Sequence, residues 1–266
     1  MRAEIPPSQL RRVTRRMILS GALGLGTAAV WPRTAAHASA ATGPEIFDCA
    51  AWGARPPAEP VVILSTPPER IVVHHTATAN VEDYSRQRAF ALARAIQNYH
   101  MDSQGWIDTG QHFTVSRGAF VTEGRHHSLD ELTAGARQVR SAHCVGQNNV
   151  SVGIENEGTY TSVEPPAKQY GALVALCAHV CRQYGLPPSE IYGHRDFNDT
   201  ACPGDRLYAL LPRLREDVAV QVGADLGEDL WDTIEFEDGM RWSGPSEYLP
   251  ADVLERALRR PRPRRP

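Results

Sequence analysis

The sequence shows no internal repeat, no apolar run long enough to cross a membrane, and no cluster of Lys and Arg inside its central part. Without a repeat, one domain with flanking segments is the simplest organisation for 266 residues. The formal net charge of −3, without a central basic patch, argues against nucleic acid as a partner. The apolar run 17–31 is uncharged but too short for a transmembrane helix.

Residues 1–40 instead have the features of a secretory signal peptide. The pair Arg15-Arg16 precedes the apolar run, and Ala38-Ser39-Ala40 forms a small-x-small cleavage pattern. Residues 14–19 fit a twin-arginine signal, which addresses a chain for export. We therefore expect a secreted, extracytoplasmic protein without stable membrane insertion after cleavage. A retained N-terminal anchor is the alternative.

Five cysteines in an exported chain suggest one or two disulfides and at least one thiol with another role. If Cys202 has that other role, three pairings are open among the remaining four, and the sequence does not choose between them: Cys49, Cys144, Cys177 and Cys181.

Hydrophobic periodicity predicts alternating strands and helices between residues 41 and 220. Strands are expected over 71–73, 150–156 and 191–192, a hairpin over 112–121, and helices over 86–101, 167–184 and 205–218. This order indicates an α/β domain with a central mixed β-sheet flanked by helices. Tyr99 and Trp106 are expected in its core.

The composition changes after residue 220. Residues 224–238 are acidic, and the end of the chain is basic and rich in proline, which does not favour a packed core. We expect 221–266 to be a loosely ordered appendage with a weak helix over 251–259. Its basic end is expected to be solvated, with adhesion to an anionic wall polymer as the alternative.

The segment GHRDFNDTACPGD, residues 193–205, places His194 and Cys202 on a polar loop. The pair alone is weak evidence, but His74 ends the apolar strand and supplies a third candidate ligand. Two imidazoles and one thiolate make a zinc site with a fourth position open to water, as catalytic zinc requires. A cysteine nucleophile would leave the second histidine without a role.

Two further side chains suit hydrolytic chemistry. Glu155 ends the strand SVGIEN and could take a proton from water and pass it to a leaving amine. Glu157, two residues on, competes for this role because alternate residues of a strand share a face. Thr200 lies two residues before Cys202, where its hydroxyl could donate to a polarised carbonyl oxygen.

Five segments, in matching order, resemble the peptidoglycan recognition protein and type 2 N-acetylmuramoyl-L-alanine amidase family. The resemblance covers residues 48 to about 217, and its segments are CAAWGARPP (49–57), IVVHHTAT (71–78), IQNYHMDSQGWIDTGQHFTVSRGAFVTEGR (96–125), NNVSVGIENEGTY (148–160) and GHRDFNDTACPGD (193–205). It implies zinc-dependent hydrolysis of the amide between N-acetylmuramic acid and L-alanine in peptidoglycan, by a protein that we expect to be a monomer.

The resemblance also implies residue roles. His74, His194 and Cys202 correspond to the family's zinc ligands, and Glu155 and Thr200 to its catalytic groups. The WGAR segment and the loop 126–149 would line a groove for sugar and peptide. The substrate-binding candidates are therefore Trp52, the arginine of WGAR, Gln111, Arg125, His143 and Asn149.

One departure concerns the chemistry. Many catalytic members carry Tyr where this chain has Gln111, and an amide has no useful pKa. A protein that binds peptidoglycan without cutting it is therefore an alternative. A peptidase that cuts within the stem peptide is another, because it would use similar zinc chemistry.

Overall fold

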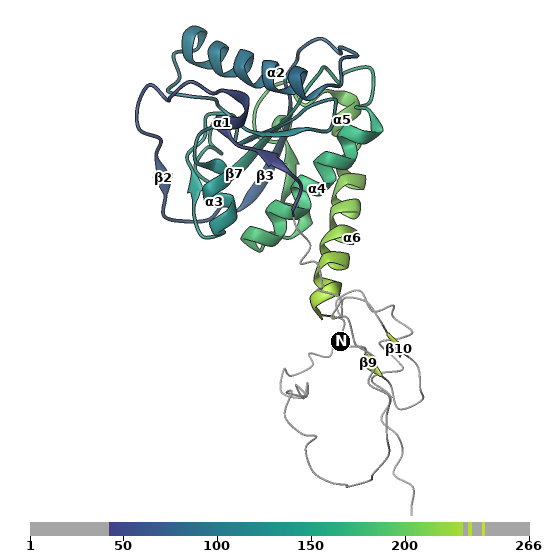
Figure 1. Ribbon diagram of the computed structural model, residues 1–266. Coiled ribbons are helices and arrows are strands. Elements are labelled where there is room, and N and C mark those ends of the chain that lie inside the picture. The colour runs from purple at the N-terminus through teal and green to yellow at the C-terminus, as the bar shows by residue number, and fades with distance from the viewer. Residues whose placement is uncertain (1–42, 231–233, 236–240, 243–266) are drawn as a thin grey trace, which may run out of the picture. The chain divides into compact units, whose positions relative to one another are not determined.

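A computed structural model describes residues 43–230, 234–235 and 241–242 (Figure 1). The expected signal peptide up to its cleavage site and the helix expected over 251–259 lie outside these residues. Within the described part of the chain, no helix is long and apolar enough to span a membrane.

The centre of the domain is a six-stranded sheet with the order β1-β5-β4-β7-β3-β8 (Figure 1). Its strands are β1 (Ile46–Phe47), β3 (Arg70–His75), β4 (Phe113–Val115), β5 (Val121–Glu123), β7 (Ser151–Asn156) and β8 (Ile191–Gly193). Only the β4–β5 hairpin is antiparallel, and the other neighbours run parallel. This confirms the expected central mixed sheet. Two short pairs lie outside it: β2 (Ile63–Leu64) with β6 (Gln138–Val139), and β9 (Ile234–Glu235) with β10 (Arg241–Trp242).

Helices flank this sheet. They are α1 (Cys49–Trp52), α2 (Arg86–Asn98), α3 (Ser128–Ala134), α4 (Ala167–Tyr184), α5 (Asp205–Ala209) and α6 (Leu211–Leu230), with the short turns η2 (Tyr99–Ser103), η3 (Pro188–Glu190) and η4 (His194–Asp196). The apolar stripes of α4 and α6 join one core cluster with Ile71, Val73 and Ile154 from the strands. Because strand residues alternate between faces, His74 and Glu155 lie on the opposite face of the sheet.

The hairpin, β7 and α4 agree with the sequence pattern, but the last expected helix differs. It is broken at Leu210 into α5 and α6, and α6 then continues to Leu230, past the expected boundary at residue 220. Pro212 explains the break, because its ring would clash with the carbonyl of Tyr208 in a continuous helix.

Two further expectations, one about Tyr99 and one about disulfides, were wrong. Tyr99 is 57% exposed rather than in the core, because it lies at the C-terminal end of α2, where it continues the helix at the edge of its buried face. No disulfide forms, since all five cysteines lie within the described residues and are free thiols. Cys49, for example, lies with its Sγ 3.5 Å from the carbonyl oxygen of Gly124, and Cys177 and Cys181 are buried in the core beside α6.

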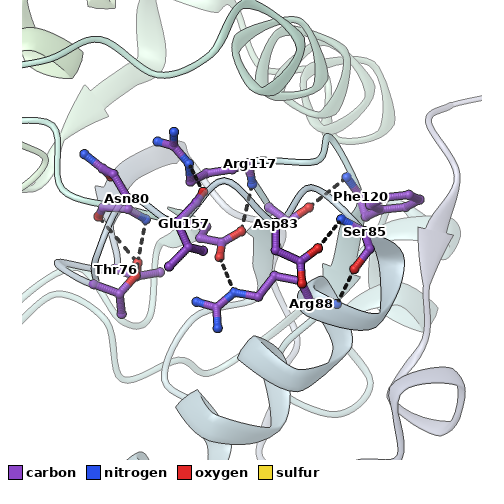
Figure 2. Close-up of polar contacts among 12 residues, drawn as sticks. Thr76, Asn80, Asp83, Ser85, Arg88, Arg117, Phe120 and Glu157 are labelled. Atoms are coloured by element: carbon purple, nitrogen blue, oxygen red, sulfur yellow. Dashed lines mark hydrogen bonds and ion pairs between the residues drawn. The ribbon is translucent and has the colours of Figure 1, made fainter.

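A buried carboxylate joins the chain that follows β7 to α2 and to the turn between β4 and β5. Glu157 is fully buried, and its two oxygens accept hydrogen bonds from Nε of Arg88 and from the backbone N–H of Arg117, both at 2.9 Å (Figure 2). The hydroxyl of Thr76 accepts a bond from the N–H of Gly158 at 2.9 Å. The bond between Thr76 and Gly158 fixes the chain just beyond His75 against the chain just beyond Asn156.

Candidate active site

Three segments far apart in sequence meet where the strands end. His74 lies near the end of β3, His194 directly follows β8, and Cys202 follows on the loop before α5. One ligand atom from each residue lies within 4.8 Å of the other two. Nδ1 of His74 is 3.1 Å from Nδ1 of His194 and 3.6 Å from Sγ of Cys202.

The two distances from Nδ1 of His74 fit a tetrahedral metal ion. Zinc bonds of about 2.05 Å to nitrogen and about 2.3 Å to sulfur give tetrahedral edges of about 3.3 Å between nitrogens and about 3.6 Å between nitrogen and sulfur. Burial, followed by the nearby imidazole of His194, holds the pKa of His74 well below its ordinary value. Burial also lowers the pKa of His194. Both rings are therefore neutral near pH 7, as metal ligation requires.

The thiol of Cys202 receives support from the backbone. The N–H of His75 points at its Sγ from 3.4 Å. Burial raises the pKa of Cys202 to about 12, with the carboxyl of Glu155 a smaller contribution in the same direction. A divalent cation held at this point would reverse that balance, because a thiol that coordinates such an ion is deprotonated.

Glu155 stands beside the histidines. In the parallel pairing of β3 with β7 it is the register partner of His74, and its side chain helps to line a cavity of about 390 Å³ that also takes in His194 and Cys202. Burial raises the pKa of Glu155 to about 8. A carboxyl with a pKa near the working pH is suited to general acid–base catalysis. Glu157 is held by Arg88 and Arg117 as described above and is not part of the cavity wall.

Two other predicted residues line the same cavity. Thr200 accepts a hydrogen bond from the N–H of Cys202 at 3.2 Å, which leaves its own hydroxyl hydrogen to donate. Gln111 is buried, and its Nε2 donates to the hydroxyl of Thr114 at 2.8 Å. Its Oε1 is buried without a hydrogen-bond partner among the described residues.

The cavity wall includes two aromatic rings that the sequence reading did not assign to it, His100 and Trp106. Their ring centroids lie 4.6 Å apart at an interplanar angle of 34°. The N–H of Gly110 donates to Nδ1 of His100 at 3.1 Å and so fixes that ring. The expectation that Trp106 lies in the core was wrong. The Gly-Trp turn that follows α2 was the available signal, because it carries the indole beyond the helix.

Several expected substrate-binding residues do not reach this cavity. Trp52 is 1% exposed, and its Nε1 donates to the carbonyl of Glu123 at 2.8 Å. Arg125 is also buried, and it donates to the carbonyls of Thr109 and Arg140 at 2.6 and 2.9 Å. Both side chains are used in holding loops together, so their positions do not support contact with a substrate here.

The arginine of the WGAR segment is Arg55, and the residue at position 54 is Ala54. Ala54 packs against a small apolar cluster that includes Trp52, so it offers no charged group to a substrate. Arg55 forms a two-pronged ion pair with Asp102, with distances of 2.9 and 2.7 Å, and is not part of the cavity wall.

The last two substrate-binding candidates differ from each other. Asn149 is exposed away from the cavity wall, and its backbone carbonyl accepts a bond from Gln138. His143 does line the cavity, but its Nδ1 faces Nε2 of His74 at 2.9 Å, so it lies behind the candidate ligand.

Residues 64–205 match the family model of N-acetylmuramoyl-L-alanine amidase. The chain belongs to this family. It is 32% identical over 170 residues to human N-acetylmuramoyl-L-alanine amidase, a match that covers 63% of this chain but only 28% of that relative. It is 34% identical over 150 residues to peptidoglycan recognition protein 1 of Bos taurus, covering 56% of this chain and 73% of the relative.

Solved structures agree with this assignment. Wild-type Drosophila PGRP-LB superposes with a TM-score of 0.54 at 28% identity, over 62% of this chain and 91% of that one. Peptidoglycan recognition protein-LE, in complex with tracheal cytotoxin, superposes with a TM-score of 0.56 at 27% identity, over 63% and 92%. These matches confirm the expected family and fold.

Proposed function

We propose that this chain is a zinc-dependent N-acetylmuramoyl-L-alanine amidase, which hydrolyses the amide between N-acetylmuramic acid and L-alanine in peptidoglycan. The observation that carries the proposal is one cluster of side chains: two neutral imidazoles and a thiol whose ligand atoms lie within 4.8 Å of one another, with the half-buried carboxyl of Glu155 beside them. The family match and the relatives named as amidases support the choice of bond.

The proposed metal ligands are His74, His194 and Cys202. When bound there, zinc would polarise the scissile carbonyl and make a water molecule easier to deprotonate. Three protein ligands leave one coordination position for water or substrate, which is the arrangement of catalytic rather than structural zinc sites.

Glu155 is the proposed acid and base. It takes a proton from the attacking water as the oxygen bonds to the carbonyl carbon, and it gives that proton to the amine nitrogen when the carbon–nitrogen bond breaks. Thr200 donates its hydroxyl hydrogen to the carbonyl oxygen as negative charge develops there. Gln111 offers its unpaired Oε1 as an acceptor on the cavity wall, where many family members have a tyrosine hydroxyl.

The proposed substrate is a muropeptide. Tracheal cytotoxin, a monomeric diaminopimelic acid-type peptidoglycan, is the ligand of the PGRP-LE structure, and it is also bound in the ectodomain complex of PGRP-LCa and PGRP-LCx. Within the organisation proposed from the sequence, residues 41–220 form the amidase domain of a monomer, 1–40 direct twin-arginine export, and 221–266 form an appendage.

Binding of peptidoglycan without cleavage is the second candidate, and Gln111 is the observation that favours it. Its amide cannot supply the ionisable hydroxyl found in many catalytic relatives. The two candidates differ in their products, because a binding protein releases none.

Mass spectrometry of peptidoglycan incubated with the purified chain and zinc tests the proposal. Cleavage at the proposed bond yields free L-alanine amino termini and free lactyl carboxylates on muramic acid, and a chelator abolishes both. Sedimentation with the wall and no products would support the binding protein. New termini inside the stem peptide would instead indicate a peptidase.

A further inference from the structure

The proposed metal site works only if each imidazole presents a bare Nδ1. A neutral ring carries one hydrogen, on either Nδ1 or Nε2, and the partner of the second nitrogen determines which. Hydrogen-bond chains behind His74 and His194 fix this choice for both rings. This inference rests on the proposed zinc site, but it concerns residues that face away from any metal.

The chain behind His74 begins at a backbone carbonyl. The hydroxyl of Ser151 donates to the carbonyl of Gln147 at 2.8 Å, and a carbonyl can only accept. The Ser151 oxygen is then free to accept from Nε2 of His143, 3.3 Å away. With its hydrogen on Nε2, His143 has a bare Nδ1, and this atom accepts from Nε2 of His74 at 2.9 Å. The remaining nitrogen of His74, Nδ1, carries no hydrogen.

The chain behind His194 is shorter. Nδ2 of Asn198 donates to the carbonyls of Val145 and Phe197, at 3.3 and 3.0 Å, and this fixes the orientation of the amide. Oδ1 of Asn198 therefore faces Nε2 of His194 at 3.1 Å, and as an oxygen it can only accept. His194 carries its hydrogen on Nε2, so its Nδ1 is also bare. The same Oδ1 accepts from the thiol of Cys144 at 3.2 Å.

We propose that Ser151, His143 and Asn198 are positioning residues that set both candidate ligands in the Nε2–H form. The two bare Nδ1 atoms then face each other at 3.1 Å, where neither can donate to the other. Two lone pairs held this close repel, and a cation between them removes the repulsion. The protein thus builds the ligand geometry in advance.

Packing supports the role of His143. A Cβ added to Gly153 would lie 2.3 Å from Cδ2 of His143, so the absence of a side chain at residue 153 makes room for the ring. His112, which stacks edge-on with His143 at 5.8 Å, is itself fixed by the N–H of Gly153 and the carbonyl of Val139. The ring of His143 is therefore held between strand β7 and His112 rather than free in the cavity.

Nitrogen-15 NMR of the metal-free full chain tests the proposal directly. Two-bond nitrogen–proton correlations distinguish the two neutral forms of each histidine. We expect His74, His143 and His194 all to appear as the Nε2–H form. An Nδ1–H form at either His74 or His194 would overturn the proposal.

Zinc affinity, measured by competition with a chromogenic chelator, provides the second readout. Asn198→Leu and His143→Leu remove the acceptors, and we expect each to weaken zinc binding by about 10–100-fold. Asn198→Asp and His143→Gln restore an acceptor, and we expect them to recover most of the lost zinc affinity. Asn98→Leu, at the exposed end of α2, is the matched control and is expected to bind zinc as the unmodified chain does. Equal affinity in the Leu and the acceptor-restoring variants would overturn the proposal.

Neither readout depends on amide cleavage. If the chain binds zinc and shows these tautomers but releases no muropeptide products, the positioning roles stand and the proposed amidase function fails. If the chain does not bind zinc, the proposed function fails while the tautomers still test the hydrogen-bond chains.

Discussion

His74 and His194 are 120 residues apart in sequence, yet their Nδ1 atoms lie 3.1 Å apart. The parallel pairing of β3 with β8 accounts for this, because Val73 and Gly193 are register partners and each histidine follows one of them. On the other side of β3, His74 is paired with Glu155. Three adjacent strands thus place the proposed acid–base group and two proposed ligands in one row.

The variant Glu155→Gln tests the acid–base role. The amide keeps the shape of the carboxyl but cannot accept the proton, so we expect kcat to fall by about 10²-fold or more, the usual scale for a general base. Zinc content and melting temperature should stay close to those of the unmodified chain. Undiminished turnover of purified muropeptide by this variant would remove Glu155 from the mechanism.

Glu157→Gln is expected to show the opposite pattern. This side chain is fully buried between Arg88 and the N–H of Arg117, so neutralising it weakens two charge-assisted hydrogen bonds (Figure 2). We expect a loss of about 1–3 kcal/mol in the free energy of unfolding, measured in urea, with bound zinc retained. The control Glu164→Gln, at an exposed position, should change stability by no more than about 0.5 kcal/mol. Equal stability of the two variants would contradict the role given to Glu157.

Gly153→Ala tests whether the ring of His143 needs the space above β7. The new Cβ would lie 2.3 Å from that ring, and overpacking of this kind costs about 1–3 kcal/mol. Thermal unfolding should therefore show a lower melting temperature. Gly171→Ala is the control, because no atom lies within 4 Å of its added Cβ and alanine suits the interior of α4 better, by about 0.5–1 kcal/mol. If both variants raise the melting temperature, the packing argument is wrong.

The pair His126 and Asp108 predicts a pH dependence of stability. The hydrogen bond to Asp108 raises the pKa of His126 in the folded protein. The stability that this bond adds is therefore complete below the ordinary histidine pKa of about 6.5, and it is lost as pH rises through the raised pKa of the folded state. Burial pushes the pKa of Asp108 upward, but hydrogen bonds from His126 and Gln97 outweigh it and lower the pKa. The stability that ionised Asp108 adds is lost as pH falls through its lowered pKa.

The variant His126→Gln should therefore lower the melting temperature most between about pH 4 and 6.5, and the difference from the unmodified chain should shrink above that range. His127→Gln is a matched control, because His127 and its partner Asp130 are 54% and 78% exposed and such pairs add little. A melting-temperature difference that grows with rising pH would show that the sign of this linkage is wrong.

The sequence predicted most of the sheet because its strands and long helices have strong periodicity. It also singled out His74, His194 and Cys202, which the structure brings together. His74 lies near the end of a strand, and the other two lie on the polar segment 193–205. The strand pattern alone could not separate Glu155 from Glu157, although the family resemblance pointed to Glu155. That distinction depends on Arg88 and Arg117, which reach the second carboxylate from other parts of the chain.

Side-chain direction accounts for the other differences. The WGAR motif is present, but α1 turns Trp52 inward to the carbonyl of Glu123, and pattern alone does not show this. Tyr99 is exposed at the end of α2, and Trp106, beyond the π-helical turn that follows, lines the cavity. The hydrogen-bond chains behind His74 and His194 join residues from separate loops, so no local sequence signal marks them.

Zinc K-edge X-ray absorption of the purified chain, loaded with one equivalent of zinc, tests the proposed ligand set of His74, His194 and Cys202. We expect one sulfur at about 2.3 Å and a shell of nitrogen and oxygen atoms at about 2.0–2.1 Å, with two of them from imidazole rings. A zinc shell with no sulfur, or with more than one, would contradict it.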